Sequence, residues 1–144
     1  SNFNSPEILQ LEMGAGGGIG NARGLASLID SLTDGVHPLY LKKDTLDYLM
    51  KYPEAPIEGW EDIVFKQDAF RFHAGFMKPS KKHDFAKTNR AFGGFGAGGS
   101  FVFHDPEYKL TIAYTMNKMS SKMMNMEREL NIRNSVYKTI ANIV

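Results

Sequence analysis

The chain contains no cysteine, which excludes disulfide bonds, zinc–thiolate sites and a thiol nucleophile. Its four histidines are scattered and lack H-x-H or H-E-x-x-H spacing, so we expect no metal site and no cofactor. It also lacks an apolar run long enough to span a membrane and a recognisable signal peptide. With 42% hydrophobic residues, the composition indicates a soluble protein with a packed core, in a compartment that the sequence leaves open.

The chain also has almost no excess of charge of either sign. The net charge is +1 at pH 7, and one short segment is basic through Lys78, Lys81, Lys82, Lys87 and Arg90. No aromatic residues that could stack on bases are interleaved with these cations. We therefore interpret the segment as a solvated loop that joins two strands, and we expect no nucleic-acid partner.

The most informative stretch is FGGFGAGGS at residues 92–100, in which five of nine residues are glycine. Such a run indicates that a neighbour or a ligand approaches the backbone closely. Residues 94–99 match the dinucleotide-binding pattern G-x-G-x-x-G, but that fingerprint must follow a strand and open a helix. Here the glycines lead into alternating residues on either side of Asp105-Pro106-Glu107, which predicts a hairpin. A kinase glycine loop needs catalytic loops downstream, and only about 30 residues follow Tyr114.

Five blocks in order resemble the β-lactamase-related serine hydrolases, which comprise class C β-lactamases, penicillin-binding-protein-like proteins and esterases. The blocks are GGGIGNARGLASL (16–28), LKKDTL (41–46), FGGFGAGGS (92–100), DPE (105–107) and YTMNKM (114–119). The resemblance covers nearly the whole chain, but it corresponds only to the last third or so of such a domain. It implies a partial β-lactamase/transpeptidase-like fold of α+β class, an antiparallel sheet with flanking helices.

The resemblance also implies that the nucleophile lies outside this chain. In the family, a Ser-x-x-Lys motif and a Tyr-x-Asn or Ser-x-Asn element precede the region matched here, and neither form of the second element occurs in the sequence. The one Ser-x-x-Lys, from Ser135 to Lys138, lies within apolar residues at helical spacing. We interpret it as a coincidental match in a helix.

The third family motif, Lys-Thr-Gly or His-x-Gly on the strand that borders the active site, falls on Gly94, Phe95 and Gly96. Glycine therefore occupies the position of the cation or imidazole that helps to bind substrate or transfer protons. By the same resemblance, the N–H of the next residue, Ala97, would point into the oxyanion hole, which needs a donor but no particular side chain.

Periodicity and end signals predict the elements. In the first half, a helix capped by Asn21 has an apolar face and ends before Gly35, and a shorter helix covers 44–51. Residues 8–13 are expected to be a strand or extended, and Trp60 a packing anchor. In the second half, we predict strands at 70–77, 100–104 and 110–116 and a helix over 127–143. The resemblance implies a five-stranded sheet, whose other two strands would come from outside the chain.

A cluster of methionines lies between the last predicted strand and the last helix, and we interpret it as core filler or a soft interaction surface: Met116, Met119, Met123, Met124 and Met126.

The predicted organisation is one domain portion, 1–144, divided into a helical part (1–52), a connection (53–69) and a part with strands and the C-terminal helix (70–144). The first residue is Ser1 rather than methionine, from which we expect a start inside a longer protein. An exposed sheet edge would then favour self-association.

Two function classes stay open. In the first, the chain is the C-terminal portion of a serine hydrolase that cleaves a small-molecule ester or amide through an acyl-enzyme, and is inactive alone. In the second, it is a non-catalytic module that binds a ligand or a protein, and the glycine at position 94 is the sign of lost catalysis.

Overall fold

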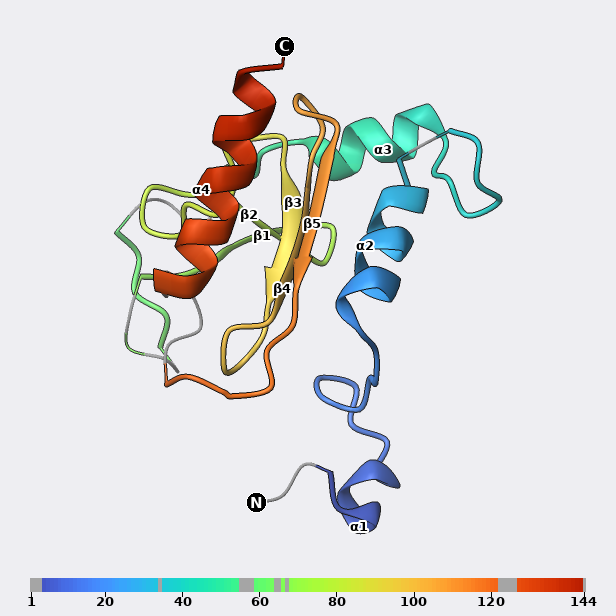
Figure 1. Ribbon diagram of the computed structural model, residues 1–144, viewed down its shortest axis with the longest axis vertical. Helices are drawn as coiled ribbons and strands as arrows, with labels where there is room; N and C mark the ends of the chain where they lie inside the picture. The colour runs from blue at the N-terminus through green and yellow to red at the C-terminus, as the bar shows by residue number, and fades with distance from the viewer. Residues whose placement is uncertain are drawn as a thin grey trace.

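The computed structural model describes residues 4–33, 35–54, 59–63, 66, 68–121 and 127–143. In chain order, the elements are α1 (Pro6–Leu9), α2 (Ala22–Ser31), α3 (Lys43–Met50), β1 (Arg71–His73), β2 (Phe76–Lys78), β3 (Phe92–Phe95), β4 (Phe101–Asp105), β5 (Leu110–Tyr114) and α4 (Glu127–Ala141). All strands pair antiparallel in the order β1-β2-β3-β4-β5. The sheet lies between α4 on one face and α2 on the other (Figure 1), which is the predicted α+β architecture.

The helices begin and end where the sequence provides the chemistry. The side chain of Asn21 accepts a hydrogen bond from Gly24 N at 2.9 Å and caps α2, as predicted. The helix α3 has no such cap at its start, but its C-terminal end is closed by Lys78, which is 1% exposed. The Lys78 ammonium donates to the carbonyl oxygens of Leu49, Met50 and Arg90 at 3.3, 3.2 and 3.1 Å.

Residues 8–13 are not a strand. The short helix α1 begins instead at Pro6, because Ser5 accepts a hydrogen bond from Ile8 N and proline is favoured in the first helical turn. The prediction for Trp60 is also wrong, since this side chain is 56% exposed and packs into neither core cluster.

The single strand predicted over 70–77 is two strands. Ala74 and Gly75 have φ angles of 49° and 84°, and two consecutive positive φ angles form the two-residue hairpin turn that joins β1 to β2. The glycine-rich run supplies β3, so the chain itself provides five strands. The expectation of three strands, completed by two from outside the chain, is therefore wrong.

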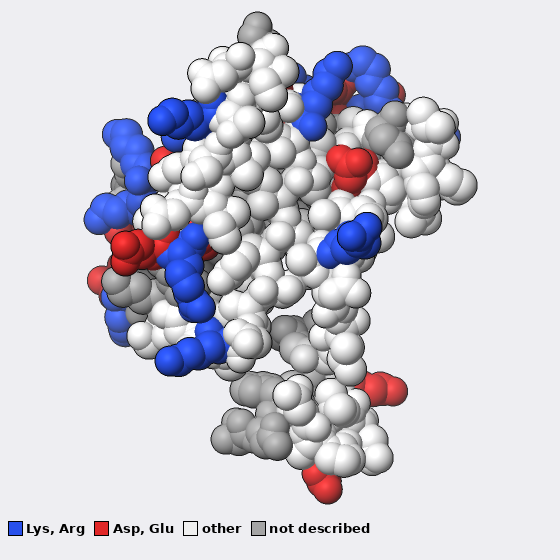
Figure 2. All heavy atoms as spheres, viewed as in Figure 1, with Lys and Arg blue, Asp and Glu red and all other residues white. Residues whose placement is uncertain are grey.

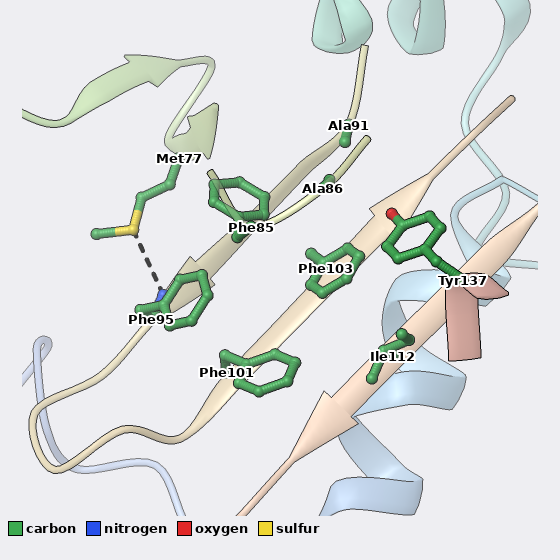
Figure 3. Packing of buried hydrophobic residues seen from close by; sticks show 9 residues of the cluster. All are labelled: Met77, Phe85, Ala86, Ala91, Phe95, Phe101, Phe103, Ile112 and Tyr137. Carbon is green, nitrogen blue, oxygen red and sulfur yellow. Dashed lines mark hydrogen bonds between the residues drawn. The ribbon is translucent and has the colours of Figure 1, made fainter. Parts of the chain in front are cut away.

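Each face of the sheet has its own apolar cluster. Toward α4, rings from neighbouring strands stack in a row with Tyr137 of that helix (Figure 3); the cluster contains Met77, Phe85, Ala86, Ala91, Phe95, Phe101, Phe103, Ile112 and Tyr137. Toward α2 and α3, the buried members are Ile29, Leu49, Met50 and Phe92, with Val102 packed against them. Side chains of β3 and β4 thus alternate between two cores.

Candidate active-site strand

The candidate site is the end of β3 and the turn that follows it. In the ladder with β4, Gly94 lies opposite Val102 and Phe95 lies opposite Phe101. The ladder with β2 contains one residue pair, Met77 with Gly93. Beyond Gly93, the edge of β3 that faces β2 has no strand partner among the described residues.

Gly94 and Phe95 face opposite sides of the sheet. Phe95 is buried in the cluster beneath α4, and its N–H donates to the sulfur of Met77 at 3.4 Å (Figure 3). Gly94 shares the face of Val102, and a Cβ built on it would meet no heavy atom within 4 Å. The position that the resemblance assigns to the family's imidazole or ammonium group therefore has open space beside it.

The glycines beside Gly94 serve the backbone. A Cβ at Gly93 would lie 2.2 Å from the carbonyl oxygen of Val102 and 2.6 Å from Phe103 Cα, so only glycine fits there. After the strand, Gly96 N donates to Ser100 O at 2.8 Å, and Gly99 N donates to Gly96 O at 3.0 Å. These two bonds close a tight turn over residues 96–99.

Ala97 occupies the second position of this turn, and Gly98 occupies the third with φ of 87°, as in a type II turn. An N–H at the second position takes no part in the bond that closes the turn. Ala97 is exposed, and no hydrogen bond joins its N–H to another residue in the described part of the chain. The Ala97 N–H is thus an exposed, unused backbone donor at the end of β3.

The alternative serine lies elsewhere. Ser135 and Lys138 are both exposed on α4, which covers the opposite face of the sheet from the open space at Gly94. Within the described ranges, no hydrogen bond connects the Ser135 hydroxyl to a base, and the carbonyl of Ser135 accepts an intrahelical bond from Thr139 Oγ1 at 2.9 Å. This arrangement fits the interpretation of the motif as coincidental.

The hydrogen bonds around the buried His104 stabilise the fold and do not have the arrangement of a catalytic triad. His104 Nδ1 lies 2.8 Å from Thr111 Oγ1, which donates to Asp30 Oδ1 at 2.7 Å. An activated nucleophile would need the imidazole between the hydroxyl and the carboxylate, and here the hydroxyl is in the middle. Burial lowers the pKa of His104 despite the opposing charges of Asp30 and Asp105, and the chain of bonds ties α2 to β4 and β5.

Metal and membrane features can be assessed only for the described part of the chain. There, no three His, Asp or Glu side chains are grouped to hold a metal ion. Nor does any helix in those ranges have the length and apolarity needed to cross a membrane. Of the methionine cluster, Met123, Met124 and Met126 lie outside the described residues.

Cationic side chains are concentrated away from the candidate strand. Figure 2 shows Lys and Arg on the α4 side of the molecule with acidic side chains among them, and further charged side chains over α2 and near α3, while the surface between α4 and α2 is largely uncharged. The predicted basic loop does join two strands, β2 and β3. A cavity of about 750 Å³ beside this loop is lined by Lys81, Lys82 and Arg71, and it includes none of residues 94–97.

A five-stranded antiparallel sheet with flanking helices is the architecture of the β-lactamase-like α+β domains. The sequence profile of the Beta-lactamase family matches residues 2–136. The chain therefore belongs to the β-lactamase family, as the motifs at 16–28, 41–46 and 92–119 predict.

Three solved structures share the fold. EstA from Arthrobacter nitroguajacolicus Rue61a matches with a TM-score of 0.79 and 23% identity, over 99% of this chain and 38% of that one. A penicillin-binding protein homologue from Caulobacter crescentus matches with a TM-score of 0.67 and 26% identity, over 82% of this chain and 31% of that one. A family VIII carboxylesterase matches with a TM-score of 0.64 and 24% identity, over 83% and 31%.

The chain thus spans between 31% and 38% of the length of these structures. Comparison with curated proteins gives no match.

Proposed function

We propose that this chain provides one wall of the active site of a serine hydrolase that cleaves an ester or an amide through an acyl-enzyme. A serine hydroxyl from outside the chain adds to the carbonyl carbon and gives its proton to a base. The base returns the proton to the alcohol or amine as its bond to the carbonyl carbon breaks, and water then hydrolyses the acyl-enzyme. In this proposal, Ala97 N–H binds the oxygen that carries negative charge between these steps.

The observation that supports this function is the unused N–H of Ala97 at the end of β3. An oxyanion donor must be fixed before reaction and must be free of internal partners, and the turn over residues 96–99 meets both conditions. The names of the structural relatives, an esterase, a penicillin-binding protein homologue and a carboxylesterase, agree with acyl transfer as the reaction class.

The chain alone is expected to be inactive, because acyl transfer needs an activated nucleophile and Ser135 is not placed to be one. The experiment measures hydrolysis of nitrocefin and of a p-nitrophenyl ester by the isolated chain and by the Ser135→Ala variant. Turnover above background that is lost in Ser135→Ala would overturn this part of the proposal.

Gly94 favours a second candidate function, a non-catalytic module that binds a ligand or a protein. A hydrogen atom cannot transfer protons or bind a carboxylate, and the space beside Gly94 is empty. Gly94→His, made in a longer protein that carries Ser-x-x-Lys, distinguishes the two functions. A positioned acid–base group accelerates such a reaction by about 10²–10⁴-fold, so a higher esterase rate in Gly94→His supports the hydrolase. An unchanged rate in a protein shown to be folded supports the binding module.

A further inference from the structure

The turn that carries Ala97 has an exposed half and a buried half. Gly96 and Ala97 are exposed, whereas Gly98 and Gly99 are buried although they lie in a loop. Both buried glycines have positive φ, 87° and 101°. Glycine adopts such angles without steric cost, but it also leaves them easily, so the conformation of this half depends on what covers it.

The cover comes from the segment after β5. Ser120 N donates to Gly98 O at 3.0 Å. A Cβ placed on Gly98 would lie 2.8 Å from Met119 Cγ and 2.9 Å from both Cβ and Cε of the same side chain. The methionine therefore curls around the α-carbon of Gly98, with one face against the turn.

Burial of its own surface does not explain the position of Met119. The side chain is 59% exposed, and it belongs to neither apolar cluster. Its side chain instead lies against the α-carbon of Gly98. A second methionine of the same segment, Met116, accepts the hydroxyl of Ser100 at 3.7 Å, so the segment holds both ends of the buried half.

The Ala97 N–H lies in the peptide plane that links Gly96 to Ala97, and the carbonyl of the same plane, Gly96 O, accepts the Gly99 N–H that closes the turn. If Gly98 leaves its positive φ and the closing bond is lost, this peptide plane is released, and the Ala97 N–H no longer keeps a fixed direction at the edge of β3. An oxyanion donor with a mobile direction loses the advantage of being fixed before reaction.

From this geometry we infer that Met119 is a positioning residue, which holds Gly98 and through it the direction of the Ala97 N–H. The inference rests on the proposed function, because fixing the direction of the Ala97 N–H matters only if this group binds the oxyanion. It also assigns the segment between β5 and α4 a role at the site, in addition to connecting two elements.

The experiment is amide hydrogen exchange, followed by NMR, on the isolated chain and on Met119→Ala. The Gly99 and Ser120 amides, whose bonds close and cover the turn, are expected to exchange about ten-fold faster or more, and the Ala97 amide resonance to shift. The amides of β4 and β5 are expected to keep their rates. Met119→Leu keeps the Cβ and Cγ contacts and should restore wild-type exchange.

Met13→Ala is the matched control, because Met13 is 37% exposed and lies in the N-terminal segment away from the turn. Unchanged exchange at Gly99 and Ser120 in Met119→Ala would overturn the inference. Faster exchange throughout β4 and β5 would also overturn it, because it indicates a general loss of stability. So would exchange in Met119→Leu that stays as fast as in Met119→Ala. The exchange measurement involves no turnover, so it tests the role of Met119 separately from the proposed function. If the longer protein shows no hydrolysis but exchange responds to Met119→Ala as expected, the proposed function is contradicted and the role of Met119 stands.

Discussion

Two adjacent glycines of β3 have opposite surroundings. A side chain at Gly93 would overlap the backbone of β4, whereas one at Gly94 would enter empty space on the α2 side. The same residue type thus serves close packing at one position and leaves an unfilled volume at the next.

We predict that Gly93→Ala destabilises the chain by about 1–3 kcal/mol, because the backbone of β4 must move to accept the methyl group. Gly94→Ala is the matched control and should leave stability unchanged or raise it by up to about 1 kcal/mol, since alanine restricts the unfolded chain. Urea unfolding of the two variants measures the difference. Equal losses in both would contradict the assignment of the two positions.

The surroundings of Lys78 change its pKa and therefore the pH dependence of stability. It is buried at the end of α3 with three carbonyl partners and no carboxylate among its hydrogen-bond partners. Burial, aided by the positive charge of Arg90, lowers the pKa of Lys78 to about 8.

The free energy of unfolding should therefore rise with pH between about pH 8 and 10. In this window the unfolded lysine still holds its proton while the folded one releases it, so the unfolded state binds more protons. The slope contributed by one group is at most about 1.4 kcal/mol per pH unit. Lys78→Met is expected to remove this rise, and the same substitution at the exposed Lys138 to keep it. Denaturant titrations at several pH values provide the measurement, and an identical slope in all three proteins would refute the prediction.

At the scale of elements, a buried polar contact within an apolar surface joins α4 to the sheet. The Tyr137 hydroxyl donates to Asp105 Oδ2 at 2.7 Å, and Thr88 Oγ1 donates to Asp105 Oδ1 at 2.6 Å. Asp105 is fully buried at the end of β4, and burial together with this bond raises the pKa of Tyr137.

We predict that Tyr137→Phe lowers stability by about 1.5–3 kcal/mol, because it leaves a buried carboxylate short of one donor. Tyr108→Phe is the control. Its ring packs edge-on against Tyr137 at 5.1 Å, and its hydroxyl has no hydrogen bond to another described residue. Thermal or urea unfolding should show a clear loss for Tyr137→Phe and a change within about 0.5 kcal/mol for Tyr108→Phe. Equal changes in the two variants would contradict the role of the Asp105 contact.

Most elements could be predicted from local signals, and the exceptions have identifiable causes. The cap at Asn21 and the apolar spacing in α2 and α4 act within a few residues, so their bounds are close to the prediction. The alternation of Phe70, Phe72, Ala74 and Phe76 continues through a turn, which hid the hairpin between β1 and β2. The glycines of β3 have little intrinsic preference for a strand, and pairing with β4 decides their conformation.

The candidate site shows a similar division. The motif locates residues 94–97, but it cannot show that Phe95 N donates to a sulfur or that Met119 covers Gly98. Those contacts join segments distant in sequence, and nothing in either segment specifies the other. Tertiary packing decides which residues surround the Ala97 N–H, and a local sequence motif carries no information on such packing.

At the scale of the whole molecule, the sheet ends at β1 and β5, and β5 is the longer of the two. Its residues are uncharged, and the face between α4 and α2, where it lies, is largely uncharged as well (Figures 1 and 2). An uncharged edge strand offers its backbone groups to another strand.

We propose that the isolated chain self-associates through the β5 edge. Light scattering should show a mass that increases with concentration, and the outward amides of β5 should become protected from exchange as it does. Amides of β3, which lies inside the sheet, serve as the reference because their protection should not change. A strict monomer at high concentration, with β5 amides that exchange freely, would refute the proposal.

The strand order has a consequence for how the chain is built during protein synthesis. Each strand pairs with the one made just before it, and the longest connection runs over residues 79–91. Pairings between sequence neighbours close small loops and form early, and polypeptides emerge from the ribosome in the same direction. Every new strand therefore finds its template already present, and α4, which follows the last strand, then covers one face of the completed sheet.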